Sequence, residues 1–229
     1  MATSVLFAAA AVEPALELAV KGGGSAAVKL FLLMTLLSFA SALVISVTSF
    51  TRIIIVLSFV RQALGAQQMP PNQVMLALAL ALSGFIMAPT AQAAYAEGLG
   101  PYLDDKMGAE QAIRQGSAPV RTFLLRQTRS EDLRLFYEVS GRERPERGEE
   151  VPMTVAIPAF LVSELTTSFR MGLFVYLPLV LVDLLVSSIL MSLGMMMVPP
   201  TLISLPLKVG IFLLADGWHL LVQSLVRSF

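Results

Sequence analysis

The sequence predicts an all-α, membrane-associated fold, because apolar residues are in excess and charge is absent from long stretches. Of the 229 residues, 56% are hydrophobic and only 14% are charged, and the mean hydropathy is +0.76. A typical soluble domain has about 25% charged residues, so much of this chain must face lipid or other apolar chains. No segment shows the period-two alternation that is typical of β-strands.

Three segments contain no Asp, Glu, Lys or Arg: residues 30–51, 62–96 and 184–207. Each is long enough to include a membrane-spanning helix, which needs about 20 apolar residues. Between Glu97 and Glu150, by contrast, there are 11 acids and 9 bases. The sequence therefore predicts two apolar halves joined by a water-facing insertion.

These contrasts divide the chain into four parts. The expected parts are a signal-like or flexible N-terminus at 1–28, a first apolar helical hairpin at 29–96, a polar, partly helical insertion at 97–150, and a second apolar hairpin with a methionine loop at 151–229. The first basic residue is Lys21, whereas a signal peptide begins with a basic region. A working signal and a degraded or absent one therefore remain alternatives.

In the first hairpin, one helix is expected over 26–65, ending at Gly65 as its C-cap. Asn72 is the expected N-cap of a returning helix that reaches Ala96. The insertion predicts an amphipathic helix over 118–139, followed by a solvated turn at 141–150.

The second half repeats this plan. A long helix is expected over 158–193, with a kink at Pro178. A loop at 194–200 and a returning helix over 201–227 complete it. The predicted architecture is two long, kinked antiparallel helical hairpins joined by a polar helical insert.

Six charges in the predicted apolar helices have no opposite charge three or four residues away, the spacing at which helix neighbours meet. They are Arg52, Glu164, Arg170, Asp183, Lys208 and Asp216. An unpaired charge in hydrocarbon is costly, so such residues face a protein interior or a watery path. They could pair between helices of one chain, pair with neighbouring subunits, or line a pore. The sequence favours neighbours or a pore, because a single four-helix unit has little interior for six charges.

The most specific local feature is a run of three methionines between helix breakers. The predicted gate residues are Met195, Met196 and Met197, and the predicted hinges of their loop are Gly194, Pro199 and Pro200. Methionine commonly fills gaps in a core, but three adjacent residues cannot all point into one core. A ring of such loops from several subunits would instead form a flexible apolar gasket that yields to a passing polypeptide.

Several classes of function are excluded by what the sequence lacks. With no cysteine and a single histidine, His219, it offers no thiolate chemistry and no histidine metal cluster. It contains neither an H-E-x-x-H motif nor a phosphate-binding G-x-x-x-x-G-K-[ST] loop. Zero net charge gives no field to attract nucleic acid. We therefore expect a non-enzymatic protein without cofactors, and an ion or proton channel with carboxylate relays remains an alternative.

Several strings resemble the FliP family of flagellar type III export-gate proteins. They are TSFTRIIIVL at 48–57, ALG at 63–65, PPNQ at 70–73, FIMAP at 85–89, LLRQTR at 124–129, PAF at 158–160, SEL at 163–165, LGMMMVPP at 193–200 and DGW at 216–218. They occur in unbroken order over roughly residues 29–229. The equivalent subunit of virulence-type injectisomes shares most of them, but LRQTR and VPP are more similar to the flagellar branch.

The resemblance implies a helically staggered homo-pentamer built with FliQ-like and FliR-like subunits, beside FlhB-like and FlhA-like export proteins. It places the chain in the bacterial inner membrane at the flagellar basal body, with the polar insertion on the periplasmic side and much of the assembly above the bilayer plane. The three methionines would close the resting channel through which unfolded flagellar subunits pass. A separate ATPase and the proton motive force would drive that transport.

Overall fold

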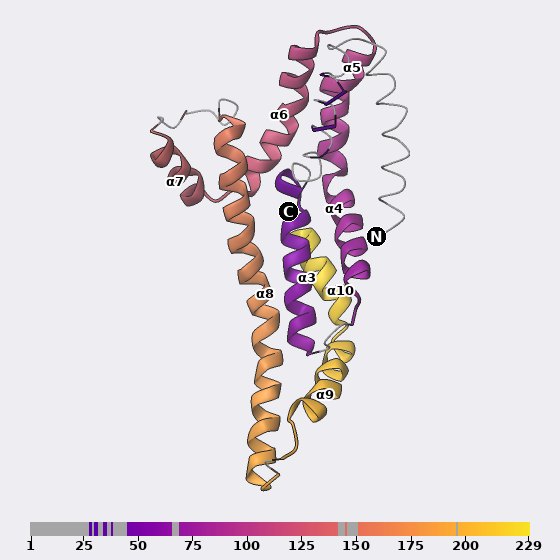
Figure 1. The fold of residues 1–229 in the computed structure, drawn as a ribbon, viewed down its shortest axis with the longest axis vertical. Helices are drawn as coiled ribbons and strands as arrows, with labels where there is room; N and C mark the ends of the chain where they lie inside the picture. Colours follow the sequence, from indigo (N-terminus) through magenta and orange to yellow (C-terminus); the bar gives the residue numbers. More distant parts are fainter. Residues whose placement is uncertain are drawn as a thin grey trace. The chain divides into compact units, whose positions relative to one another are not determined.

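The computed structural model describes residues 28, 30–31, 34–35, 38, 45–65, 69–141, 145, 151–195 and 197–229. Within them every regular element is helical, with eight α-helices and one π-helical turn (Figure 1). The chain forms two compact units, residues 1–45 and 46–229. Residues 1–27 of the signal-like or flexible N-terminus expected at 1–28, and the middle methionine, Met196, lie outside the described residues.

In the first unit, the described residues from 28 to 38 are helical. The hydroxyls of Thr35 and Ser38 donate to the carbonyl oxygens of Phe31 and Met34, each four residues earlier, at 2.8 and 2.9 Å. All elements below belong to the second unit.

Helices α3 (Phe50–Leu64) and α4 (Asn72–Ala94) pack against each other as a hairpin. Helix α3 is the centre of the larger hydrophobic core, because its apolar residues recur at helical spacing and face α4, α8 and α10. Its most deeply buried apolar residues are Ile53, Val56, Leu57, Val60 and Ala63. The predicted C-cap is confirmed, since Gly65 has φ 71° and its N–H donates to Gln62.

The prediction of a single helix over 26–65 is wrong, because the helix is interrupted at Thr48 and Ser49. Residues 45–47 are helical, the chain turns at Thr48 and Ser49, and α3 then begins at Phe50. The Phe50 N–H lies 3.4 Å from the Thr48 hydroxyl, and the buried Ser49 hydroxyl donates to Ser83 of α4 at 3.1 Å. Hydroxyl groups that bond in this way compete with the helical backbone, which explains the break.

Beyond α4 the chain continues through a π-helical turn, η1 (Tyr95–Leu99), and α5 (Gly100–Leu103), and α6 (Ala109–Gln127) returns along it. This approach is close: a Cβ atom added at Gly98 would lie 2.6 Å from Gly116 Cα.

The amphipathic helix expected over 118–139 is in fact two helices, α6 and α7 (Ser130–Ser140). Thr128 and Arg129 between them are extended, with ψ of 131° and 142°. The Arg129 N–H donates at 3.0 Å to Ser163 of α8, so a tertiary contact takes the place of a helical hydrogen bond. Together with the start of α8, α6 and α7 form the second hydrophobic core.

Helix α8 (Met153–Ser192) is 40 residues long and begins five residues before the predicted start. The helix expected over 201–227 is divided into α9 (Thr201–Leu214) and α10 (Gly217–Arg227), bent by 62°. Asp216 at the bend has φ 50°. A Cβ atom at Gly217 would lie 2.4 Å from the Phe212 ring, so a larger residue there would have to displace that ring.

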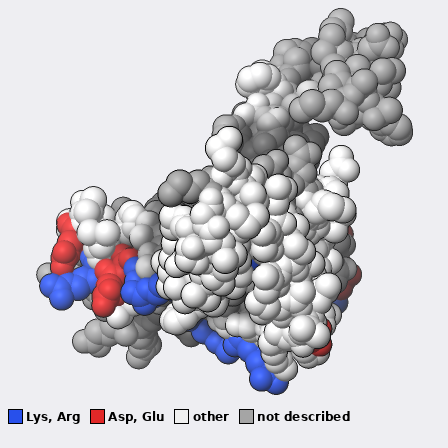
Figure 2. All heavy atoms as spheres, turned by 90° about the horizontal axis from the view of Figure 1, so that it is seen from below, with Lys and Arg blue, Asp and Glu red and all other residues white. Residues whose placement is uncertain are grey.

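By length and composition, Asn72–Leu103 and Met153–Ser192 could each cross a membrane, and the bent pair α9 and α10 could form a third crossing. Most described atoms on the face drawn in Figure 2 belong to uncharged residues. Large apolar side chains on α8 are widely exposed, Phe174 at 78% and Leu181 at 57%. Such surfaces are typical of chains that contact lipid or other subunits.

Candidate functional site

Among the described residues of the second unit, the most deeply buried charges are Arg52 of α3 and Glu164 of α8. The Arg52 residue is 2% exposed and Glu164 is fully buried. Arg52 Nε donates to Glu164 Oε2 at 2.9 Å, and Nη2 donates to Oε1. This two-point geometry is the strong form of an arginine–carboxylate pair. The pair joins α3 to α8, and its two residues are 112 positions apart in the sequence.

The remaining donors of Arg52 are also used. Its Nη1 donates to the carbonyl oxygen and the hydroxyl of Ser228 at 2.8 and 3.0 Å, and its Nη2 donates to Gln127 Oε1 at 3.2 Å. Gln127 Nε2 in turn donates to the Phe229 carbonyl at 2.7 Å, and the guanidinium lies 3.8 Å from the centroid of the Phe229 ring. Because a buried charge needs such partners, this network fixes α3, α6, α8 and the residues after α10 to one another.

A second pair joins α8 to α9. Lys208 is 3% exposed, and its Nζ donates to Asp183 and, at 2.9 Å, to the carbonyl oxygen of Ala63. Ala63 is in the last turn of α3, where a helix presents unsatisfied carbonyl groups that favour a cation. The lysine therefore ties α9 to α8 and to the C-terminal end of α3.

A third group of charges holds α7 against α8. Arg129 donates from Nε and Nη2 to the two carboxylate oxygens of Asp132 at 2.8 and 2.9 Å, and the Ser163 hydroxyl donates to Asp132 at 2.5 Å. Burial of Asp132 raises its pKa, but the hydrogen bonds from Arg129 and Ser163 outweigh burial and leave this pKa below its ordinary value.

Four of the six predicted charges pair between helices of one chain, which is one of the alternatives that the sequence left open, although the sequence favoured neighbouring subunits or a pore. These four are Arg52, Glu164, Asp183 and Lys208. The physical reason is that converging helices supply polar neighbours that local spacing cannot reveal. Arg170 and Asp216 are exposed, and neither forms a salt bridge within the described residues.

Sequence reasoning missed Gln127 and Ser228, which complete the network. A signal for Gln127 was present, because it follows Val120 by seven residues and Leu124 by three, the spacing of one helix face. A polar amide on that inward face indicates a buried hydrogen-bond partner. Ser228, after the end of α10, offered no comparable signal.

The methionine loop connects α8 to α9 at the lower end of both helices in Figure 1. The Gly194 N–H donates to Met191 and the Met195 N–H donates to Leu190 at 2.9 Å, and with Gly194 at φ 73° this is a Schellman helix end. Met195 is 44% exposed and Met197 is 96% exposed. Helix α9 begins directly after Pro199 and Pro200, so the predicted hinges do flank the loop.

The chemistry of these residues is structural rather than catalytic. Among the described residues, no group of three or more His, Cys, Asp or Glu side chains could hold a metal ion. The buried charges are bound to one another, and the exposed loop presents flexible apolar side chains. The arrangement can hold a set of helices rigidly while leaving an adaptable apolar tip.

Comparison with known proteins identifies the family. Residues 33–225 match the FliP family. The chain is 47% identical over 205 residues to the flagellar biosynthetic protein FliP of Bacillus subtilis (strain 168), covering 90% of this chain and 93% of that protein. It is 50% identical over 202 residues to FliP of Pectobacterium carotovorum subsp. carotovorum (88% and 78% covered) and 43% identical over 219 residues to FliP of Aquifex aeolicus (strain VF5) (94% and 92%). The chain therefore belongs to the FliP family.

Proposed function

We propose that the chain is a channel-forming core subunit of the flagellar type III protein export gate, through which unfolded flagellar subunits cross the inner membrane. As a member of the FliP family, it is a non-enzymatic component of that gate in the bacterial inner membrane at the flagellar basal body. Beyond this, we propose that the chain forms the channel, in a complex with a fixed number of copies, and that named residues of the chain close it.

The observation that carries this proposal is the length of the exposed apolar surface on α8. Helix α8 has 40 residues, and its exposed large apolar residues run from Leu165 to Leu185 and on to Ile189. This apolar surface is about 36 Å long, which exceeds the thickness of about 30 Å of a bilayer's hydrocarbon core. The part beyond the bilayer needs cover from other protein chains, as it would have in a multi-subunit gate.

The methionine loop supports the gate itself. In a pentamer, five copies of this loop would meet around one axis. Met195, Met196 and Met197 would close the channel, and Gly194, Pro199 and Pro200 would be the hinges of the loop. The side chains are unbranched and apolar, so they can seal against one another and yield to many sequences. By resemblance, FliQ-like and FliR-like subunits complete the helically staggered core, next to FlhB-like and FlhA-like proteins.

An ion or proton channel is the alternative. It would need Glu164, Asp183 or Asp216 as a relay that gains and loses protons. Glu164 and Asp183 are each bound to a cation of the same chain, Arg52 and Lys208, which favours a structural role. Exchanging the two partners of a pair should preserve a structural role and destroy a relay.

The test is the composition of the complex. The chain is expressed with and without its FliQ-like and FliR-like neighbours, extracted in mild detergent and weighed by native mass spectrometry. We expect a discrete complex with five copies of this chain and fewer of a FliR-like one. A stable monomer under every condition would contradict the proposal.

A further inference from the structure

Two charged residues of opposite sign, Arg170 of α8 and Asp216 at the bend between α9 and α10, are exposed. Neither forms a salt bridge within the described part of the chain. Large apolar side chains near both residues are exposed as well. When other chains cover these apolar surfaces, each of the two charges needs a partner there.

Arg170 lies within the exposed apolar surface of α8. The exposed Phe169 precedes it, and the exposed Leu173 and Phe174 follow it by three and four residues, the spacing of one helix face. An arginine inside a covered apolar surface is costly unless an anion faces it. Whatever covers this part of α8 therefore has to present an anionic group to Arg170.

Among the described residues, no acid is bonded to Arg170. Asp132 interacts with it electrostatically, but the two carboxylate oxygens of Asp132 already accept hydrogen bonds from Arg129. The Ser163 hydroxyl donates to the same carboxylate. The guanidinium of Arg170 therefore keeps its N–H donors for a partner outside these residues.

Asp216 lies in a similar apolar surface at the bend. It is at the N-cap position of α10, where an aspartate side chain commonly accepts a hydrogen bond from the first turn, but here it makes no such bond. The neighbouring Leu213, Leu214 and Leu220 are exposed, Leu214 at 91%. The carboxylate of Asp216 is therefore available to a cation from outside α10.

The positions of the other exposed charges single out this pair. Among the described residues outside the polar insertion at 97–150, the exposed charges are Asp216, Arg170 and Arg227. Arg227 is in the last turn of α10, where unsatisfied carbonyl groups favour a cation, and residues 221–229 include no large exposed apolar side chain. Arg170 and Asp216 are thus the cation and the acid that lie among exposed apolar residues.

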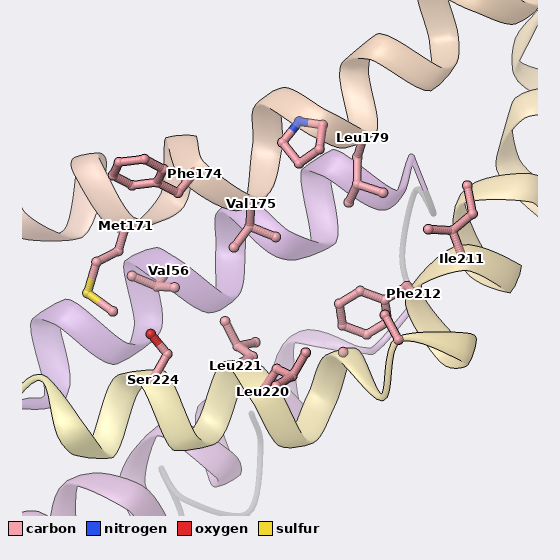
Figure 3. A pocket seen from close by; sticks show the side chains of 13 residues that line it. Val56, Met171, Phe174, Val175, Leu179, Ile211, Phe212, Leu220, Leu221 and Ser224 are labelled. Atoms are coloured by element: carbon pink, nitrogen blue, oxygen red, sulfur yellow. The ribbon is translucent and has the colours of Figure 1, made fainter.

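Within one chain, the two charges lie at different heights along α8. Leu179 of α8 and Phe212 of α9 line the same apolar pocket and lie toward the same end of it (Figure 3). Since the Phe212 ring also lies beside Gly217, the bend with Asp216 is level with Leu179. Arg170 precedes Leu179 by nine residues, which is about 14 Å of helix. A second copy displaced along α8 would bring its bend to the height of Arg170.

We propose that copies of this chain contact one another through these two surfaces, with Arg170 of one copy paired to Asp216 of the next. The apolar residues around Arg170 would pack against the leucines around Asp216. Because the two surfaces differ, the contact is heterologous and repeats from copy to copy. The difference in height along α8 displaces each copy relative to the one before it, so the copies form a staggered series and not a flat ring.

Charge complementarity selects a second copy as the occupant of both surfaces. A phospholipid would cover the apolar residues, and its phosphate would match Arg170 but repel Asp216. A second copy provides the opposite charge at each surface, together with apolar residues that cover those around it. This inference rests on the proposed function, because it requires several copies in one complex, and it identifies the surfaces by which they meet.

The first experiment is cross-linking between introduced cysteines, since the chain has none of its own. Arg170→Cys with Asp216→Cys is produced with the FliQ-like and FliR-like neighbours, treated in membranes with a short bismaleimide and separated by denaturing electrophoresis. A bismaleimide is used because an arginine–carboxylate pair holds two backbones farther apart than a disulfide does. We expect a ladder of cross-linked copies that extends beyond the dimer.

The controls use the same exposed acid and a different arginine. Each single cysteine variant should give no ladder. Arg114→Cys with Asp216→Cys should also give none, because Arg114 is exposed on α6 and has no place in the proposed contact.

The second experiment reverses the charges and reads the mass of the complex by native mass spectrometry. Arg170→Glu or Asp216→Arg alone should lower the amount of assembled complex by at least about tenfold, because like charges would face each other at a covered contact. Arg170→Glu with Asp216→Arg in the same chain should restore assembly. Arg114→Glu should assemble as the wild type does.

The proposal is overturned if the paired cysteines give no cross-link, or if the ladder ends at the dimer, which would indicate an isologous contact. It is also overturned if the double reversal assembles no better than the single reversals. A wild-type complex with several copies but no cross-link contradicts this inference alone. A monomeric wild type contradicts the proposed function as well.

Discussion

At the residue scale, this chain is held together by charges that are buried and fully partnered. Arg52 is bonded to Glu164, Gln127 and Ser228 and lies over the ring of Phe229. Removing a charge from water costs free energy, and the hydrogen bonds of this network offset that cost only while every partner is present. The network therefore specifies how the helices meet, and a single change in it should be severe.

We predict that Arg52→Met lowers the stability of the chain by about 3–5 kcal/mol, because it leaves Glu164 buried without a counter-charge. The measurement is thermal unfolding in mild detergent, followed by circular dichroism. The double variant Arg52→Met with Glu164→Met should recover much of the loss, since apolar residues of similar size can replace a buried pair.

The matched control is Arg134→Gln on α7. Arg134 also pairs with a carboxylate, Glu138, at 2.7 Å, but the two side chains are 76% and 59% exposed. Exposed pairs of this kind contribute little to stability, because water and salt screen the attraction. Equal losses of stability from Arg52→Met and Arg134→Gln would show that the buried network stabilises the fold no more than an exposed ion pair does.

A second residue-scale prediction concerns the hinge of the methionine loop. Gly194 has φ 73° and open space where a Cβ atom would lie, so Gly194→Ala meets no clash and suffers only backbone strain, about 1 kcal/mol. Gly210→Ala is the control, because Gly210 also has open space but lies inside α9, where alanine should stabilise by up to about 1 kcal/mol. Opposite signs in the melting temperature are expected, and the same sign for both would argue against a strained hinge.

At the element scale, the bend between α9 and α10 depends on Gly217 and the Phe212 ring beside it. We predict that Gly217→Ala destabilises the docking of α10 by about 1–3 kcal/mol through overpacking. Adding Phe212→Ala should rescue part of this loss, because it removes the atoms that the new methyl group meets. A double-mutant cycle on detergent-solubilised protein measures the coupling, and additive losses would refute this explanation of the bend.

The attachment of α7 to α8 should depend on pH through Asp132. Its pKa in the folded chain is below the ordinary 3.8, so the stabilisation is complete above that value and is lost as the pH falls through the lowered pKa. We predict that the melting temperature of the wild type exceeds that of Asp132→Asn by a constant amount from about pH 7 to about pH 5, and that the difference shrinks below about pH 3.8. A difference that grows on acidification would contradict this assignment.

The sequence was a good guide to these elements where local physics decides. The charge-free run at 62–96 predicted α4, and the helix-breaking Gly194 and proline pair predicted the loop after α8. The helix breaks at Ser49, Arg129 and Asp216 could not be predicted. The first two depend on hydrogen bonds to hydroxyl groups that are distant in the sequence, those of Ser83 and Ser163. The third lies where the backbone bends next to the Phe212 ring. The pairing of Arg52 with Glu164 was likewise hidden, since helical spacing relates only near neighbours in the sequence.

At the scale of the whole molecule, the exposed apolar surface of α8 and the exposed methionines are features of a chain that functions among others. Phe174 and Leu185 are 78% and 64% exposed, far more than a soluble monomer would leave open over such a length. The buried charges hold the helices of the second unit within one chain, and the apolar faces remain for lipid and for other subunits. The account therefore predicts a rigid subunit whose adaptable part is the loop between α8 and α9.

The most direct test of the central claim is the conductance of the complex in planar bilayers with Met195, Met196 and Met197 replaced by glycine. We predict normal assembly and a leak of small solutes, because the apolar side chains that close the channel are gone. Met69→Gly is the control, since Met69 is 73% exposed on a different loop, and it should remain closed. Triple variants as tight as the wild type would show that this loop is not the gate.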